Sequence, residues 1–270
     1  MLGKKLTMVP NKNQTAGILL VALFSMAAMW GLPALAQDTQ STPVSIEASV
    51  SLEWDQTAGI YTAIGDAVVE QGDKSLAGDE IIARYDTQSA ERNLTEVTAT
   101  GGVVYRTGDN VARGSKINYV IDTEAYDLSG PGAIVTSPRG TMTAEKTITY
   151  SVQDGARKQV IGIGNAAYRG EDGRVVEGAR VVAFLDADSA VDTIEAEGNA
   201  RVVTPKGIVA TADRLDYVAA TDRANLFGNV EIIDRDDILR GARAEVEFDK
   251  EISRLLSDNS GKRVTGVLTP

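Results

Sequence analysis

The sequence predicts an all-β fold, an elongated array of tandem units of about 33 residues. Three observations predict it. Aromatic residues that close an alternating stretch recur every 31 to 34 positions, at Trp54, Tyr85, Tyr119, Tyr150, Phe184, Tyr217 and Phe248. Glycines that precede a second alternating stretch recur at Gly65, Gly101, Gly132, Gly164, Gly198 and Gly228. No convincing amphipathic helix follows residue 36, so we expect one elongated domain rather than two compact ones.

The first 36 residues have the pattern of a signal peptide. Lys4, Lys5 and Lys12 form a basic start, residues 17–30 are mostly apolar, and Ala34-Leu35-Ala36 offers a cleavage site before Gln37. The alternative, a retained membrane anchor, is disfavoured because the apolar run is short for a span. We therefore predict a signal peptide at 1–36, a flexible Ser/Thr/Gln/Pro-rich leader at 37–45 and a β-repeat domain at 46–268.

Charge and cysteine content narrow the classes of partner. Residues 37–270 hold 24 basic and 38 acidic residues, a formal net charge of −14. A nucleic acid is bound through basic patches, so this balance argues against such a partner. The chain has no cysteine, which excludes disulfides and a lipid-modified cysteine at the cleavage site.

A pair of apolar residues separated by one residue recurs in seven places. Six of the seven intervening residues are polar, the exception being Ala183. Because strand side chains alternate, each pair predicts one dry face, and we expect these faces to line an apolar interior or groove. The pairs are Leu52/Trp54, Ala83/Tyr85, Ile117/Tyr119, Ile148/Tyr150, Val182/Phe184, Leu215/Tyr217 and Val246/Phe248.

The stretch after each recurrent glycine alternates less strictly. The pairs expected to face inward there are Ala67/Val69, Val103/Tyr105, Ile134/Thr136, Ala166/Tyr168, Ala200/Val202 and Val230/Ile232. Glycines within the strands, such as Gly78 and Gly178, mark bends at the same place in successive units. A sheet bent in this way folds over on itself, which predicts two facing sheets with a shared apolar interior.

The residue types that most often carry catalysis or bind metals are missing. The chain has no histidine and no cysteine. Ser115 and Lys116 are neighbours on a predicted strand, so their side chains point to opposite faces. The acidic run at 234–237 lacks the spacing of a calcium loop and is better explained as a turn. Lys206-Gly207 lacks the upstream glycines of a phosphate loop. We therefore predict no enzyme activity, no cofactor and no metal.

The interior and the ends of the array each leave two alternatives. The interior is either a core packed by its own side chains or an apolar trough suited to hydrocarbon chains. Each end either exposes a strand that pairs with another chain or is covered by a loop. The exposed strands would lie at Val50, Leu52 and Trp54 and at Arg263, Val264, Thr265 and Val267.

Several stretches resemble the repeat of a known family, the organic-solvent-tolerance A family of periplasmic lipopolysaccharide-transport bridge proteins. They are Gly65 to Gly72, Gly198-Asn199-Ala200 with Ala212-Asp213-Arg214, and Gly228-Asn229-Val230 with Ala242-Arg243-Ala244. The closing residues 261–268 are similar to that family's C-terminal edge strand. The chain is longer than expected for the bridge component, and Ala210 and Thr211 stand where other units carry glycine.

The resemblance implies a twisted, partly open β-jellyroll that holds lipopolysaccharide acyl chains in its interior. It also implies head-to-tail contacts through edge strands with an inner-membrane anchored jellyroll relative and with the N-terminal domain of an outer-membrane translocon, and a possible head-to-tail homo-oligomer. The leading hypothesis is thus a non-enzymatic periplasmic carrier that conveys lipopolysaccharide from inner to outer membrane. The alternatives are a structural or adhesive β-solenoid with a closed core and, last, a carboxylate enzyme acting on polysaccharide.

Overall fold

The computed structural model describes residues 6–7, 43–88, 92–153, 157–257 and 263–269. Apart from the short 3-10 helix η1 (Ala219–Thr221), all regular elements in these residues are strands, which confirms the predicted all-β fold. The strands are β1 (Leu6–Thr7), β2 (Ser45–Glu47), β3 (Ser51–Asp55), β4 (Ile60–Gln71), β5 (Lys74–Tyr85), β6 (Leu94–Thr107), β7 (Asn110–Val120), β8 (Ala125–Ser129), β9 (Ala133–Ser137), β10 (Gly140–Ala144), β11 (Thr147–Gln153), β12 (Arg157–Gly170), β13 (Val175–Leu185), β14 (Val191–Val203), β15 (Val209–Val218), β16 (Arg223–Asp234), β17 (Asp237–Glu247), β18 (Ile252–Leu256) and β19 (Thr265–Val267).

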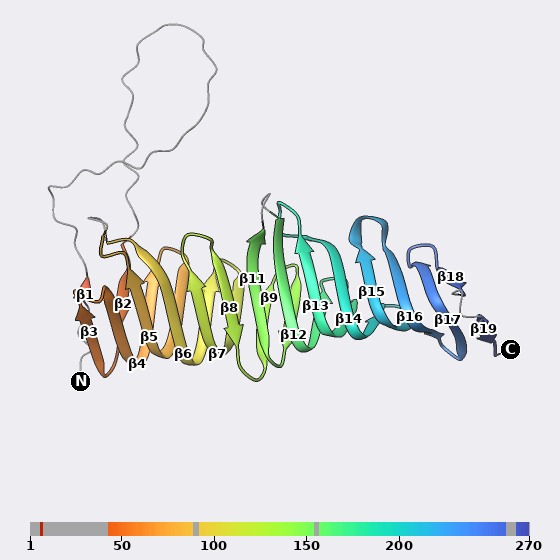
Figure 1. Cartoon of the computed structure of the whole chain (residues 1–270), viewed down its shortest axis with the longest axis horizontal. Coiled ribbons are helices and arrows are strands. Elements are labelled where there is room, and N and C mark those ends of the chain that lie inside the picture. The colour runs from red at the N-terminus through yellow and green to blue at the C-terminus, as the bar shows by residue number, and fades with distance from the viewer. Residues whose placement is uncertain (1–5, 8–42, 89–91, 154–156, 258–262, 270) are drawn as a thin grey trace, which may run out of the picture.

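Neighbouring strands pair antiparallel along one long axis, so that β3 lies at one end of the array and β19 at the other (Figure 1). Most strands are long and bend in the middle. In β4 the bend falls at Gly65 and Asp66, which have φ of 87° and 41°, and the register shifts between Ile64 and Ala67. A positive φ is accessible to glycine and to a lesser degree to Asp and Asn, which explains the recurrent Gly-Asp and Gly-Asn pairs. The recurrent glycines therefore lie inside long strands and do not begin them, except for Gly132, which directly precedes β9.

The bends divide the ladder into two facing sheets. Sheet I contains β3, β8, β11 and β18, and sheet II contains β2, β9, β10 and β19; the long strands contribute one half to each. The apolar sides of both sheets form one continuous buried cluster that runs from Ala63 to Phe248. This arrangement is the tandem, elongated β-jellyroll predicted from the sequence.

Turns lie in two rows, one along the far edge of each sheet. The turns between β4 and β5 and between β6 and β7 belong to the sheet II row, and the turn between β7 and β8 belongs to the sheet I row. The acidic run at 234–237 closes the turn between β16 and β17. The two rows face each other across the side opposite the bends, and we call the gap between them the mouth.

In the middle of the array, pairs of short strands replace bent long strands. β8 and β9 are joined by Gly130-Pro131-Gly132, and β10 and β11 by Glu145-Lys146. Here the predicted inward orientation of Ile134 and Thr136 is wrong. Ala133 and Val135 belong to the interior cluster, and Val135 pairs with the buried Ala112. Other units place one residue between the glycine and the first inward residue, but Ala133 follows Gly132 directly, which moves the alternation by one position.

Candidate functional site

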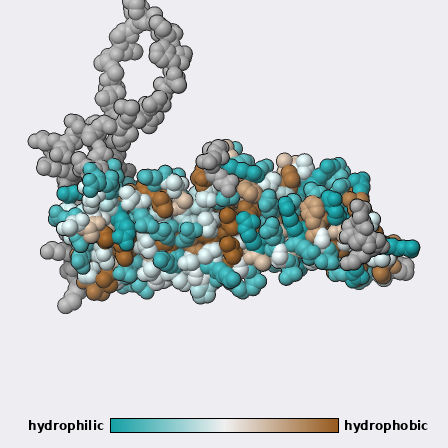
Figure 2. Space-filling model, viewed as in Figure 1, coloured by the Kyte–Doolittle hydropathy of each residue, from teal (hydrophilic) through white to brown (hydrophobic). Residues whose placement is uncertain are grey.

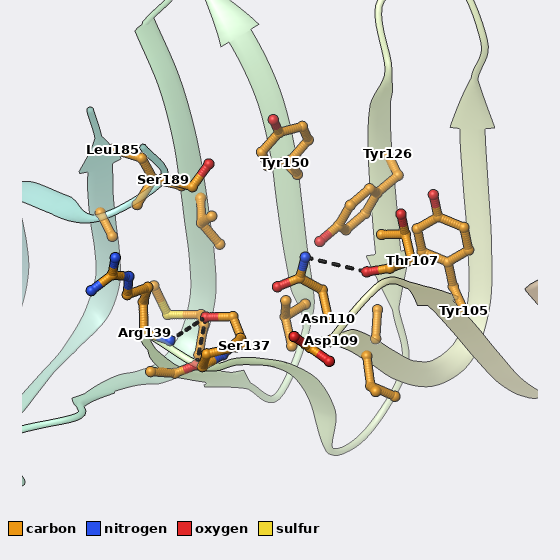
Figure 3. Close-up of a pocket in the computed structure, with 18 of the residues that line it drawn as sticks. Tyr105, Thr107, Asp109, Asn110, Tyr126, Ser137, Arg139, Tyr150, Leu185 and Ser189 are labelled. Atoms are coloured by element: carbon orange, nitrogen blue, oxygen red, sulfur yellow. Dashed lines mark hydrogen bonds between the residues drawn. The ribbon is translucent and has the colours of Figure 1, made fainter. Parts of the chain in front are cut away.

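A cavity of about 460 Å³ lies between the two sheets in the middle of the array. Its size falls within the roughly 300–1,000 Å³ typical of small-molecule sites. Figure 3 shows side chains from several neighbouring strands pointing into it. The lining comes from β5 to β14 and includes Tyr105, Val111, Ala112, Tyr119, Tyr126, Val135, Met142, Tyr150, Val160, Tyr168, Ala183, Leu185 and Val191.

Four tyrosine rings, contributed by both sheets, form a connected group that borders the cavity. Tyr126 and Tyr150 of sheet I stack, with ring centroids 5.5 Å apart and an interplanar angle of 18°. Tyr105 of sheet II reaches across to Tyr119 at 5.7 Å and to Tyr126 at 6.1 Å. Large rings that meet from opposite sheets hold those sheets apart, so the group supports the cavity beside it.

Burial keeps four of the tyrosines that line the cavity neutral. Burial raises the pKa of Tyr168 to about 12, and burial is also the largest cause that raises the pKa of Tyr105, Tyr126 and Tyr150. Because desolvation disfavours a phenolate, these rings present uncharged hydroxyls at neutral pH. The Tyr168 hydroxyl donates to the backbone carbonyl of Arg139 at 2.9 Å, which fixes that ring against the cavity wall.

The remaining wall is apolar, whereas the rim is charged. Val135, Met142, Val160, Ala183 and Leu185 supply aliphatic or thioether surface. The charged rim residues come from turns of both rows and are Lys74, Asp109, Glu124, Arg139 and Asp188. An apolar floor below a polar mouth suits an amphiphile whose hydrocarbon chain lies inside and whose polar head stays outside. In Figure 2 apolar side chains interrupt the hydrophilic surface over the middle strands.

The structure distributes the predicted groove residues over three environments. Tyr119 and Tyr150 line the cavity. Leu52 and Trp54 lie at the N-terminal end, where they are 39% and 38% exposed. The others that face inward are packed among their neighbours and are Ala83, Tyr85, Ile117, Ile148, Leu215, Tyr217, Val246 and Phe248.

The predicted inward orientation of Val182 and Phe184 is wrong. Val181 and Ala183 belong to the interior cluster. Val182, which pairs with Glu195, and Phe184, which pairs with Thr193, have the opposite orientation along the strand and lie outside that cluster, although Val182 is itself only 1% exposed. The prediction took the aromatic residue as the marker of the inward phase. In this unit Leu185 occupies the inward position that an aromatic residue holds in other units. Phe184 lies in the opposite orientation, with the Arg157 guanidinium 4.1 Å from the centre of its ring.

Sequence reasoning did not find Tyr126, which stacks at the centre of the aromatic group. The signal was present, because Tyr126 and Leu128 alternate with the polar Asp127. Their strand lies only seven residues after Tyr119, however, outside the period of 31 to 34 residues by which inward aromatics were located.

Both ends of the array carry exposed apolar side chains. At the N-terminal end Val50 is 74% exposed and precedes the edge strand β3. At the C-terminal end Val264 and Val267 are 42% and 57% exposed, and Thr265–Val267 forms β19, which pairs with Ile238 to Arg240 of β17. Arg263 is exposed just before this strand. The other C-terminal edge strand is β18, which the predicted docking residues do not include.

A sequence model described as "LptA/(LptD N-terminal domain) LPS transport protein" matches residues 45–156 and 160–252, which is most of the chain. The chain belongs to this family. It is therefore a component of lipopolysaccharide transport, the process that the family's description names. Among the described residues no helix has the length and apolar character needed to cross a membrane.

One solved structure of low similarity is the crystal structure of LptH from Pseudomonas aeruginosa, described as the LptA homologous periplasmic component of the lipopolysaccharide transport device. The match covers 85% of this chain and 96% of that chain, at 13% identity and a TM-score of 0.20. With so low a score, this match carries no argument of its own. A search of curated protein sequences finds no match.

Proposed function

We propose that this family member binds the acyl chains of lipopolysaccharide in the cavity between its sheets and conveys the lipid from the inner to the outer membrane. The observation that carries the proposal is the cavity of about 460 Å³, with an apolar floor and neutral tyrosine walls. Each buried methylene contributes about 0.8 kcal/mol, so ten methylenes supply roughly 8 kcal/mol before the cost of ordering the chain.

The proposal places the mature protein in the periplasm. Residues 1–36 act as a signal peptide, 37–45 as a leader and 46–268 as the carrier domain. All of 1–36 except Leu6 and Thr7 lies outside the described residues. These two form β1, which pairs with Ser45 and Ile46 of β2. Cleavage after Ala36 would remove β1 and leave β2 as an open edge.

Open edges at both ends support assembly into a bridge. β2 and β3 at the N-terminal end, and β18 and β19 at the C-terminal end, can each accept a further strand. The proposed partners are an inner-membrane anchored jellyroll relative, the N-terminal domain of an outer-membrane translocon, and further copies of this chain. The docking residues are Val50, Leu52 and Trp54 at one end and Arg263, Val264, Thr265 and Val267 at the other.

Photocrosslinking with a matched pair of positions tests lipid binding. Tyr150 faces the cavity, and its neighbour Thr149 faces outward and bonds to Asp127 at 2.6 Å. With a benzophenone amino acid at each position in turn, we expect the Tyr150 variant to crosslink purified lipopolysaccharide at least ten times more strongly than the Thr149 variant. Equal crosslinking at both positions, or none at Tyr150 in a folded protein, would support the closed structural solenoid instead.

A further inference from the structure

The two rows of turns that border the mouth are connected by ion pairs in a regular order. Among the described residues, Lys74 pairs with Glu124 at 3.4 Å, Arg174 with Asp222 at 2.6 Å, and Lys206 with Glu251. In each pair the cation is in the sheet II row and the anion is in the sheet I row. The partners are 50, 48 and 45 residues apart, so each bridge joins a sheet II turn to the sheet I turn that lies one unit further along.

The bridge at Arg174 is the most buried. The Arg174 side chain is 10% exposed, and its guanidinium lies 4.7 Å from the ring centre of Tyr217 and 5.0 Å from that of Phe248. Asp222 also accepts a hydrogen bond from the Tyr217 hydroxyl at 3.0 Å. A buried, hydrogen-bonded charge pair of this kind is costly to break, so it closes the mouth firmly at this position.

The same order predicts two more bridges, between the ones at Lys74 and Arg174. The sheet II turns there carry Asp109 and Arg139, and the matching sheet I positions carry Arg157 and Asp188, which are 48 and 49 residues further along. Each of these pairs has opposite charges. Neither is bridged in the part of the chain that the structure describes.

At both of these positions the cation pairs within its own sheet. Arg139 lies 3.9 Å from Glu171 in the next sheet II turn, and Arg157 lies 3.3 Å from Asp192 in sheet I. Three of the four unbridged residues, Asp109, Arg139 and Asp188, line the cavity. Ser189, next to Asp188, lines it as well (Figure 3). The gap in the row of bridges thus lies over the cavity, whose rim also includes the Lys74–Glu124 bridge.

We propose that this gap is a side portal, bounded by the Lys74–Glu124 and Arg174–Asp222 bridges, through which a hydrocarbon chain enters and leaves the cavity sideways. The proposal rests on the proposed function and adds the route. The ligand class is an amphiphile: its chain passes between Pro138-Arg139 and Asp188-Ser189, and its polar head remains among the turn residues. When the portal is empty, the facing charges of Arg139 and Asp188 favour its closure.

Crosslinking the portal shut tests this route, and the absence of native cysteine makes the chemistry selective. The double variant Arg139→Cys/Asp188→Cys is joined with bismaleimides of increasing length, and closure is verified by mass. The same variant capped with a monomaleimide carries similar bulk without the bridge. A second variant, Lys206→Cys/Glu251→Cys, is crosslinked as a control at a position that is already bridged.

The probe is cis-parinaric acid, a fluorescent fatty acid, followed by stopped flow. We expect the portal crosslink to slow uptake at least tenfold relative to the capped protein, and to slow release at least tenfold when the probe is bound before crosslinking. The control crosslink should leave both rates within twofold. Unchanged rates in the portal crosslink would overturn the side route while leaving lipid binding intact, because the probe would then use the ends of the array.

Two other outcomes also decide against the proposal. If no bismaleimide length joins the two cysteines, Arg139 and Asp188 do not face each other across the mouth. If the probe binds to no form, including the unmodified chain, the proposed lipid site fails and the portal with it. The unmodified chain therefore distinguishes failure of the route from failure of the function.

Discussion

The middle of the array and its C-terminal part are built from the same repeat, yet they differ in their hollows. The tyrosine-lined cavity lies in the middle, whereas a hollow of about 670 Å³ in the C-terminal part lies at the bends of β16 and β17, next to Gly228 and Gly241. In β14 to β17 the inward positions hold Val202, Leu215, Leu226 and Val230, which are 0–2% exposed and fill the space between the sheets. In β6 to β12 the corresponding region holds tyrosines that meet across the interior. Close packing therefore depends on the size of the inward side chains and not on the repeat itself.

The two regions also differ along the mouth. The C-terminal part is closed by the Arg174 and Lys206 bridges, whereas Arg139 and Arg157, between the Lys74 and Arg174 bridges, pair within their own sheets. An open mouth and an unfilled interior at the same place support the lipid site proposed for the middle of the array. The following variants compare the two regions.

Removing the buried cation should have the largest effect on stability. Arg174→Ala leaves Asp222 and Asp172 without their partner, and breaking a buried pair costs about 3–5 kcal/mol. Arg139→Ala is the matched control, because its side chain is 53% exposed and its pair with Glu171 is long; we expect a loss below about 1 kcal/mol. Urea unfolding of both variants measures this, and equal losses would contradict the firm closure at Arg174.

Enlarging an inward side chain should destabilise the filled C-terminal part more than the middle, and this is the second largest expected effect. Ala200 lies in the filled part and Ala183 lines the cavity. We expect Ala200→Leu to destabilise by about 1–3 kcal/mol through overpacking. Ala183→Leu should change the free energy of unfolding by less than about 0.5 kcal/mol, because the cavity accepts the added carbons. A comparable loss in both variants would indicate that the middle is as tightly packed as the rest.

The sequence was sufficient for the architecture because alternation and period are local properties of the chain. It identified Tyr119 and Tyr150 as inward residues and the bends at glycine. It failed where a unit departs from the common spacing, as at Gly132-Ala133 and at Phe184-Leu185, since a shift of one residue exchanges the two faces of a strand.

The location of the cavity and of the bridges lay beyond such reasoning. The cavity depends on which side chains meet from opposite sheets, as Tyr105 and Tyr126 do. Each bridge joins turns 45 to 50 residues apart, a distance set by the offset between the two rows of turns. Neither the contacts between opposite sheets nor the offset between the rows of turns can be inferred from the sequence of a single repeat.

Alkaline pH should weaken the middle of the array. Burial raises the pKa of Tyr105, Tyr126 and Tyr168 on folding, so the folded state holds these protons more tightly than the unfolded chain does. Their contribution is therefore complete below the unfolded pKa of about 10 and is lost as the pH rises toward the folded values, about 12 for Tyr168. We expect the urea concentration at the midpoint of unfolding to decrease as the pH rises above about 10. The decrease with pH should be less steep in Tyr126→Phe. An identical slope in that variant would contradict a buried, neutral Tyr126.

The central claim is that acyl chains occupy the middle of the interior. The most direct test maps where a lipopolysaccharide with a photoreactive diazirine at the end of an acyl chain attaches to the purified protein, by mass spectrometry of the peptides. The structure predicts attachment in β6 to β13, at residues such as Tyr105, Val135, Tyr150 and Ala183 that line the cavity. Attachment confined to the edge strands β2, β3, β18 and β19, or to outward residues such as Thr149 and Phe184, would contradict it.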